Sequence, residues 1–591
     1  MRTYNFISLV ILMAATAACG GGSGGGSGGS GGSGGAGASG GNGGNGGAGG
    51  NGGSGGAGGA MDGVTGTVKD VHQPSTGEVA VRSRLWSKIE ALVDMGGTVQ
   101  SYPGTIDADG HFSIPGVPEG PYLLALEGAP SPLLPNAPPL RSFIATDART
   151  VDLDQEFSGR PELTPMTQPT YLTIDAALTI PLQVATVDDM GNVSGNDDQL
   201  QFYSRNGMVS GYYGPSWGAP DDNPPANGAT QLSAWKINAH EAFVRFFGDP
   251  TLVDGSKGDD FTVLHDVAEQ VGAPSDDADP WSHYVYASTK EFLQAAPFTM
   301  TDGGTSVVAG TFTPAPQKAF NLDFKGSAFN ALLANVPFDL HFTGISVDHD
   351  AGAPAPAIGA FATLLGISVT NGITFTNPDP ACHGNGCDPA ACPSGCDAGT
   401  LVPAGDHARS YSYGNPFTHG QEFASVSVQV YKNVRTLLPE MTTESLRGGF
   451  LLSAPASEVT GKPVVPTLGL PENIKVAGKD TPYDQVTTGV GTTPMITWDA
   501  PSLGSPTRYR VTVVDLTDLA DANGVMSRRR NVANIAVKNP NVAIPEGVLK
   551  PGSYYYVQVA AVARDNDDFA APFMSPQRNT VSTMFTGVIT P

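Results

Sequence analysis

The stretch Leu549-Lys-Pro-Gly-Ser-Tyr-Tyr-Tyr-Val-Gln-Val559 places a Pro-Gly turn directly before a run of aromatic and β-branched residues. Such a run after a turn signal is typical of a β-strand. Short runs of this type recur along the chain, and at Val426, Val428 and Val430 the valines alternate with Ser and Gln. This alternation predicts an antiparallel strand with one buried face. We therefore expect an all-β, multidomain protein built of β-sandwiches.

The chain resembles a fibronectin type III domain over about 462–591, the region that contains the Leu549–Val559 run. Ile496-Thr-Trp-Asp-Ala-Pro501 supplies the core tryptophan, Trp498, and the Leu549–Val559 run supplies Tyr555. The resemblance implies a β-sandwich in which the Tyr555 hydroxyl bonds back to the chain upstream. Because this fold hosts many functions, it argues for interaction and spacing only by analogy.

A second β-sandwich is expected over 61–128. Gly63–Asp70 alternates as a strand, Ile106–Ile114 is predicted to be a hairpin with an Asp-Gly turn, and Tyr122–Leu126 is predicted to be a buried strand. This order resembles the carboxypeptidase regulatory-like, transthyretin-type sandwich, whose members are usually accessory or spacer modules. Within it, Leu85, Ile89, Leu92 and Val93 lie at helical spacing and predict an inserted helix over Arg82–Met95.

The start of the chain predicts a membrane anchor and a tether. The apolar run Phe6–Ala15 and the small residues before Cys19 resemble a bacterial lipoprotein signal, with 1–18 as signal peptide and Cys19 as the acylated residue. An ordinary secretory signal with an incidental cysteine is the alternative. Residues 19–60 are almost wholly Gly, Ser, Asn and Ala, so we expect a disordered linker with an r.m.s. reach of roughly 35 Å.

The central region, 166–461, follows a Pro-rich linker and strand over 129–165 and matches no family motif. Several β-rich runs and a short helix at Ser327–Val336 are expected in it. Its four cysteines, Cys382, Cys387, Cys392 and Cys396, lack the spacing of paired zinc knuckles and favour two disulfides in an exported chain. Their pairing stays open, since three connectivities are possible.

One group of residues in the central region has the composition of a carbohydrate site. Aromatic rings stack on sugar faces and nearby polar groups bond hydroxyls, which makes this group a candidate ligand site. The other reading is that the rings cover the core beneath a Pro-rich loop. The residues are Tyr212, Tyr213, Trp217, Asp221 and Asp222.

Other chemical motifs are incomplete. Ser216 lies in a G-x-S-x-G string, but the prolines that follow exclude the helix of a hydrolase elbow. His240-Glu241 lacks the second histidine of a zinc protease motif. His265-Asp266 and Asp348-His349-Asp350 are expected to be structural or solvated.

Acidic runs lie at Asp197-Asp198, Asp259-Asp260, Asp276-Asp277-x-Asp279 and Asp565-x-Asp567-Asp568. They are expected to be solvated loops, with structural calcium as the alternative, because carboxylates on loops suit Ca²⁺. No catalytic residue, cofactor or metal ligand is assigned.

These features together predict a non-catalytic lipoprotein of the outer membrane, at the cell surface or on the periplasmic face. It would present β-sandwich modules to a protein or glycan partner. The net charge of −25 argues against nucleic acid as a partner. The alternative is a carbohydrate-binding or carbohydrate-active envelope protein with its site in the central domain.

Overall fold

The computed structural model describes residues 63–591 apart from several gaps. The gaps are 75–76, 129–138, 185, 188–192, 195–196, 216–222, 244–249, 272–283, 335, 337–338, 351–360, 370–404, 419, 435–436, 439–444, 518, 521–525, 528–529 and 574–575. The predictions for the signal peptide, the linker and all five cysteines therefore lie outside the described residues. So do those for Ser216, Trp217, Asp221 and Asp222.

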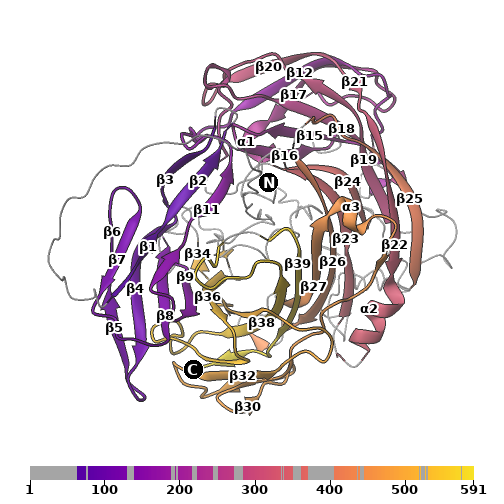
Figure 1. Cartoon of the computed structure of the whole chain (residues 1–591). Helices are drawn as coiled ribbons and strands as arrows, with labels where there is room; N and C mark the ends of the chain where they lie inside the picture. Colours follow the sequence, from indigo (N-terminus) through magenta and orange to yellow (C-terminus); the bar gives the residue numbers. More distant parts are fainter. Residues whose placement is uncertain are drawn as a thin grey trace, which may run out of the picture.

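The fold is all-β and consists of several packed β-sheets, as the sequence predicts. Figure 1 shows a bent assembly in which the first module lies beside the last module, with the central domain joining them on the other side. Within the described ranges, no helix is both long and apolar enough to cross a membrane.

The first module contains strands of three sheets and extends beyond the predicted boundary at residue 128. The segment 129–165, predicted to be a linker with a strand, contributes three strands to it. Two of them pair in parallel with the first two strands of the module. Its strands are β1 (Gly63–Thr67), β2 (Lys69–Gln73), β3 (Val79–Arg82), β4 (Trp86–Asp94), β5 (Val99–Pro103), β6 (Thr105–Ile106), β7 (His111–Pro115), β8 (Tyr122–Gly128), β9 (Arg141–Thr146), β10 (Thr150–Asp152) and β11 (Gln155–Ser158).

The helix predicted over Arg82–Met95 is wrong, because this segment forms the strand β4. Ile89, Ala91 and Val93 point into the core of the first module, with the period of two that a strand requires. Leu92 points the other way and packs against the last module. Apolar residues on both faces of one strand can have the same spacing as one face of a helix. This spacing is the reason that the sequence predicted a helix here.

The last module is a β-sandwich whose core surrounds Trp498. The Trp498 ring meets Tyr509 edge-on at 5.2 Å between centroids. The Tyr555 hydroxyl accepts a hydrogen bond from the Lys550 N–H at 3.0 Å, as predicted. The main strands are β29 (Glu472–Val476), β30 (Lys479–Asp480), β32 (Met495–Asp499) and β37 (Asn541–Ala543) in one sheet, and β33 (Arg508–Asp515), β36 (Arg530–Val537), β38 (Tyr555–Arg564) and β39 (Asn579–Phe585) in the other.

Replacing Tyr555 with phenylalanine tests this hydrogen bond. The variant keeps the buried ring but leaves the Lys550 N–H without its acceptor, so we expect the free energy of unfolding to fall by about 1 kcal/mol. Urea unfolding followed by Trp498 fluorescence measures the change. An unchanged free energy of unfolding would show that this bond does not stabilise the module.

The central domain packs a small sheet over a larger one. The small sheet contains β17 (Gln231–Asn238), β12 (Tyr171–Ala177) and β20 (Thr305–Thr311). The larger sheet contains β15 (Gln199–Ser204), β16 (Val209–Tyr213), β18 (Thr262–Gln270), β19 (Tyr284–Gln294), β23 (Asp339–Asp350), β24 (Ala362–Val369), β26 (Gln421–Asn433) and β27 (Ser445–Pro455). On the outer side lie β22 (Gln317–Lys325), β25 (Asp406–Gly414) and helix α2 (Gly326–Leu333), which confirms the predicted short helix.

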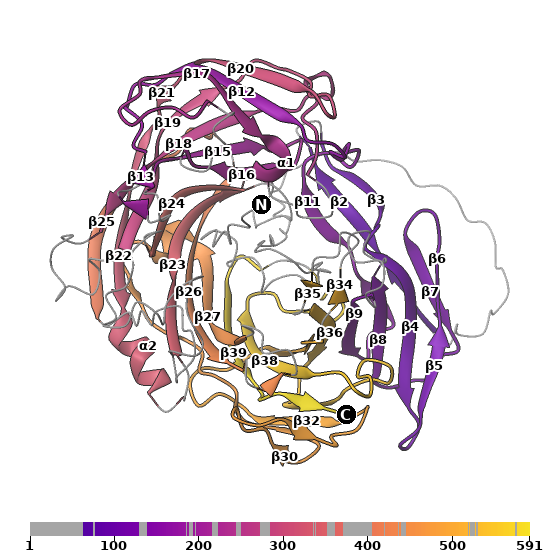
Figure 2. The same ribbon diagram turned by 180° about the vertical axis from the view of Figure 1, so that it is seen from behind.

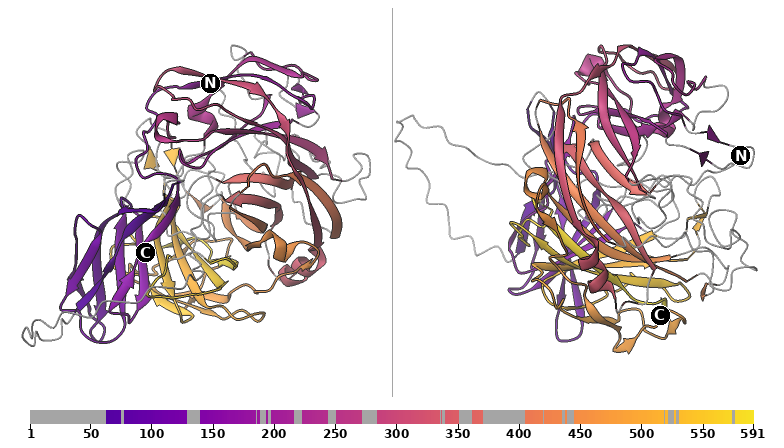
Figure 3. Two further views of the ribbon diagram at one scale, coloured as in Figure 1. Left: turned by 45° about the horizontal axis from the view of Figure 1, so that its top comes forward. Right: turned by 90° about the vertical axis from the view of Figure 1, so that its right-hand side faces the viewer.

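The larger sheet runs without interruption from the central domain into both other modules. Strand β27 pairs antiparallel with β39 of the last module, and β36 at the other edge of that sheet pairs in parallel with β9 of the first module. Figure 2 shows β36, β9 and β8 side by side, and Figure 3 shows the same assembly from two further directions. The first and last modules are therefore joined edge to edge.

Side chains cross this junction in both directions. Phe143 on β9 is buried in the core of the last module. Phe569 and Phe573 of the last module are buried in the core of the first, where Phe573 stacks on Trp86 at 5.9 Å. The two modules thus share their cores as well as their sheet.

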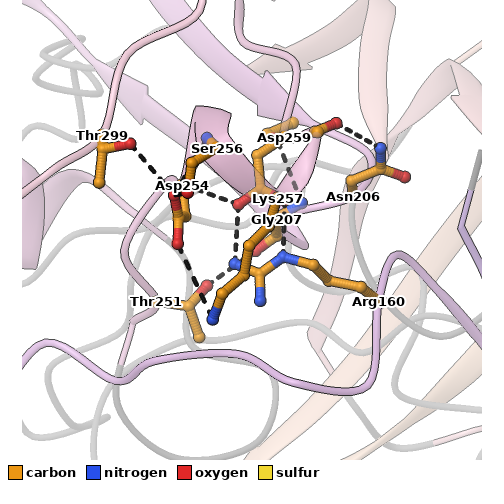
Figure 4. A network of polar contacts seen from close by, with 11 residues as sticks. Arg160, Asn206, Gly207, Thr251, Asp254, Ser256, Lys257, Asp259 and Thr299 are labelled. Carbon is orange, nitrogen blue, oxygen red and sulfur yellow. Dashed lines mark hydrogen bonds and ion pairs between the residues drawn. The ribbon is translucent and has the colours of Figure 1, made fainter.

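A second junction joins the first module to the central domain (Figure 4). The Arg160 guanidinium follows β11 and donates to both Asp259 carboxylate oxygens, at 2.7 and 2.9 Å. Asn206, in the turn between β15 and β16, accepts from the Arg160 N–H and donates to the Gly258 carbonyl. Asp259 is buried, so the prediction that Asp259-Asp260 is a solvated loop is wrong for Asp259.

Candidate functional site: a buried acid and imidazole network

The most concentrated polar chemistry of the described residues lies inside the central domain, on β15, β18, β19, β23 and β24. It begins at His265 on β18. The His265 Nδ1 atom lies 2.9 Å from Glu291 Oε1 and the Nε2 atom lies 3.1 Å from Asp198 Oδ2. All three side chains are fully buried. We call these three residues the His265 triad.

Backbone register and main-chain donors hold the triad in place. His265 lies directly across from Glu291 in the β18–β19 pair. Asp198 accepts from the Ala268 and Gln183 N–H groups at 2.9 and 2.7 Å. The N–H of Thr179 donates to Glu291 at 2.9 Å, and its hydroxyl donates to the same oxygen. Gln183 itself lies in a loop, and its N–H is directed at the Asp198 carboxylate.

The triad holds a positive charge in the interior. Burial disfavours the charged imidazole, but hydrogen bonds to Asp198 and Glu291 outweigh this and raise the His265 pKa to about 9. The protonated ring then donates to both carboxylates, and both carboxylates keep further donors. This is a buried ion pair whose members each have hydrogen-bond partners, the condition under which such a group is tolerated.

A second cluster lies around Gln201 on β15. We define the Gln201 cluster as Gln201, Asp266, Thr289, Asp348 and Thr363. Asp266 lies across from Thr289 because β19 has a bulge between Glu291 and Thr289. The Thr289 hydroxyl donates to Asp266 Oδ1 at 2.7 Å and the Gln201 Nε2 group donates to Asp266 Oδ2 at 3.1 Å.

The other half of the cluster uses β23 and β24. Asp348 lies across from Thr363, again beside a bulge, and accepts the Thr363 hydroxyl at 2.5 Å. Its other oxygen accepts the Ser346 hydroxyl at 2.5 Å. The Gln201 carboxamide pairs with the main chain of Thr363, accepting from its N–H at 2.8 Å and donating to its carbonyl at 2.9 Å.

Burial gives Asp266 and Asp348 higher pKa values than ordinary carboxyl groups have. It raises the pKa of Asp266 to about 7 and that of Asp348 to about 6. Burial also raises the pKa of the neighbouring Tyr212 well above its usual value. Asp266 bonds the Gln201 carboxamide and Asp348 bonds the Thr363 hydroxyl. Two acids with raised and different pKa values can accept and supply a proton near neutral pH.

Replacing Asp266 with asparagine tests the neutral state of this carboxyl group. The folded-state pKa of about 7 lies above the unfolded value of 3.8, so the folded state retains a proton that the unfolded state releases between these pH values. The wild-type stability contribution is therefore lost as pH rises from about 4 to about 7. At pH 8 the variant is expected to be more stable by on the order of 2 kcal/mol.

Urea unfolding from pH 4 to pH 8 measures this difference. The matched control is Asp260→Asn, which changes an exposed aspartate on the loop before β18. The control should follow the wild-type pH dependence. A wild-type slope retained in Asp266→Asn would mean that Asp266 is ionised in the folded protein.

The structure corrects the predicted ligand site in part. Tyr213 is buried in the core and packs against Trp235, with 5.7 Å between ring centroids. It therefore has no open ring face for a sugar, and the reading that this ring covers the core is the one that holds. Tyr212 points toward the Gln201 cluster, and the other three predicted residues lie outside the described ranges.

The sequence reasoning missed both clusters. Asp198 and Asp567 were predicted to lie in solvated acidic loops, but Asp198 belongs to the His265 triad and Asp567 pairs with Arg508. The available signal was the density of polar residues inside apolar strands, as in Val263-Leu-His-Asp-Val267. In the part of the chain that the structure describes, no group of three or more His, Asp or Glu side chains could hold a metal ion.

Comparisons with known proteins leave the chain without a family. No family model matches it, and no curated protein does. A leucine-rich repeat protein from Bacteroides thetaiotaomicron is 13% identical over 43% of this chain, with a TM-score of 0.12, and the match covers 26% of that protein.

Two further structures match at similar levels. The chicken CNTN1 FN1–FN3 domains are 10% identical, covering 73% of this chain and 98% of theirs with a TM-score of 0.11. A streptococcal ancillary pilin is 10% identical, covering 65% and 94% with a TM-score of 0.10. Values this low carry no argument about function, and the β-sandwich architecture rests on the strand pairings themselves.

Proposed function

We propose that the chain is a membrane-anchored, non-catalytic lipoprotein of the cell envelope that presents its modules as one rigid body to a protein or glycan partner. The observation that supports this most is the unbroken sheet. It passes from β16 through the central domain into the last module and on to the first. Modules that share a sheet and a core keep a fixed orientation, as a display platform requires.

The proposed anchor is connected to the folded modules at the first module only. The Gly-rich segment ends just before β1, so the tether is attached to the first module. The first module is itself held by the last module through β9–β36 and by the central domain through Arg160–Asp259. A pull on the tether is therefore shared among all three parts.

The type of partner follows from charge and from module type. A net charge of −25 favours a neutral or basic partner over nucleic acid or an anionic membrane. The first and last modules, by their resemblance to carboxypeptidase regulatory-like and fibronectin type III domains, suit an interaction role. Tyr213 does not supply a stacking face, so the carbohydrate alternative loses one of its predicted contacts.

The anchor is tested by replacing Cys19 with alanine in the full-length chain. We expect wild-type protein to sediment with membranes and to incorporate labelled palmitate, and the variant to do neither. The matched control is Cys382→Ala, which removes a cysteine without affecting the anchor. Palmitate incorporation into the Cys19 variant, or a wild-type protein found only in the soluble fraction, would contradict the proposal.

A further inference from the structure

We propose that Gln201 and Thr363 join through an intramolecular ester, in which the Thr363 hydroxyl replaces the amide nitrogen of Gln201 and ammonia is released. The link would connect β15 with β24, whose residues lie 162 positions apart in the chain. It goes beyond the proposed display function and does not depend on it.

The Gln201 carboxamide is docked on the main chain of the residue that carries the hydroxyl before any bond forms. Gln201 is fully buried, and its carboxamide is docked on the main chain of Thr363 by the hydrogen bonds at 2.8 and 2.9 Å. The residue that binds the carboxamide is thus the residue that carries the hydroxyl. Holding two reactants in one geometry turns their reaction into an intramolecular step, which lowers its entropic cost.

A base is located at the nucleophile. The Thr363 hydroxyl donates to Asp348 Oδ1 at 2.5 Å, so this carboxylate is placed to take the hydroxyl proton as the oxygen attacks. Ser346 donates to the other oxygen of Asp348 and fixes the orientation of the group. At neutral pH Asp348, with a pKa of about 6, is mostly ionised and can accept the proton.

An acid is located at the leaving group. Asp266 Oδ2 lies 3.1 Å from Gln201 Nε2, the atom that must leave as ammonia, and Thr289 holds Asp266 Oδ1 at 2.7 Å. With a pKa of about 7, Asp266 keeps a proton in a large fraction of molecules at neutral pH. The Thr363 N–H points at Gln201 Oε1, where negative charge develops during the attack.

The reaction balances without a further reagent. A bond forms between Thr363 Oγ1 and the Gln201 carboxamide carbon, and the bond from that carbon to Nε2 breaks. The hydroxyl proton goes to Asp348, and the Asp266 proton goes to the departing nitrogen. The products are an ester and one ammonia, and Asp348 then carries one more proton and Asp266 one fewer than before. Burial excludes the water that would hydrolyse the ester.

Such a link would suit this part of the protein. The described strands of the Gln201 cluster contain no cysteine. The two linked strands belong to one sheet but do not pair with each other. An ester between them would keep the region connected even when its hydrogen bonds open.

The test is peptide mapping by mass spectrometry on the purified full-length chain, denatured before digestion. We expect one linked peptide pair that contains Gln201 and Thr363, lighter than the sum of its parts by one ammonia and separated by hydroxylamine. Thr363→Val should abolish the pair. The matched control Thr262→Val removes a buried hydroxyl of β18 that donates to Gln294 outside the cluster, and it should retain the pair.

Two results would overturn the inference. One is that wild-type protein held at pH 7 yields only separate peptides with an intact Gln201 carboxamide. The other is that Gln201 is linked to Thr289 in wild-type protein, which would place the nucleophile elsewhere. The wild-type measurement decides the matter even where a variant fails to fold. Asp348→Asn, which keeps the side-chain shape, should slow formation of the link at least tenfold.

Discussion

Replacing His265 with glutamine is expected to lower the free energy of unfolding of the central domain by about 3–5 kcal/mol, because two buried carboxylates lose their shared cation. Glutamine has a carboxamide of similar reach but no charge, and its NH₂ group cannot serve both Asp198 and Glu291 in the geometry of the ring. The remaining carboxylates lie in a site where all three side chains are fully buried. They would have to bind protons or draw in water.

Urea unfolding of the wild type and of His265→Gln at several pH values measures this effect. The folded-state His265 pKa of about 9 lies above the unfolded value of 6.5, so its contribution is complete below about pH 6.5 and is lost as pH rises through about 9. The difference between the two proteins should therefore shrink above pH 9.

The matched control is His111→Gln, which changes an exposed histidine on β7. This variant should unfold like the wild type across the whole pH range. Equal stability of His265→Gln and wild type at pH 6 would contradict the charged triad, as would a difference that grows between pH 7 and pH 10.

Replacing Phe143 with alanine is expected to lower the stability of the junction between the first and last modules by about 3–5 kcal/mol. Phe143 belongs to β9 of the first module, yet it is 1% exposed and lies in the core of the last. The Arg141 guanidinium covers its ring at 4.9 Å. The substitution opens a cavity where the two modules share a core, so both lose packing at once.

Scanning calorimetry of the full chain separates this result from a local defect. We expect the first and last modules to melt together in the wild type and to melt as two separate transitions in Phe143→Ala. Val99→Ala removes an exposed side chain from β5 of the same module and serves as the control. A variant that melts in one transition at the wild-type temperature would show that the shared core does not couple the modules.

The parts of the fold that sequence predicts best are those where one segment contains the whole signal. The Pro-Gly turn and the strand that carries Tyr555 are adjacent in the chain, and the hydroxyl partner at Lys550 is five residues away. Strand β4 shows the opposite case. Leu92 is apolar because the last module, whose first main strand begins at Glu472, covers it, and no local period can express that contact.

For the same reason, local sequence patterns could not predict the His265 triad or the Gln201 cluster. His265-Asp266 is an ordinary dipeptide in the sequence, and its two side chains belong to different clusters on β18. Their partners are Glu291 and Thr289 on β19, Gln201 on β15, and Asp198 in the loop before β15. Only the register of those strands, including the bulges beside Thr289 and Asp348, places complementary groups opposite each other.

The most direct test of the account is limited proteolysis of the full-length protein on intact cells and on lysed cells, followed by mass spectrometry of what is released. The account predicts cleavage in the Gly-rich segment before β1 and release of a large product in which the first and last modules stay associated under native conditions. Release of the two modules as independent fragments would contradict the continuous sheet. Cleavage on intact cells would place the modules at the cell surface, and cleavage only after lysis would place them on the periplasmic face.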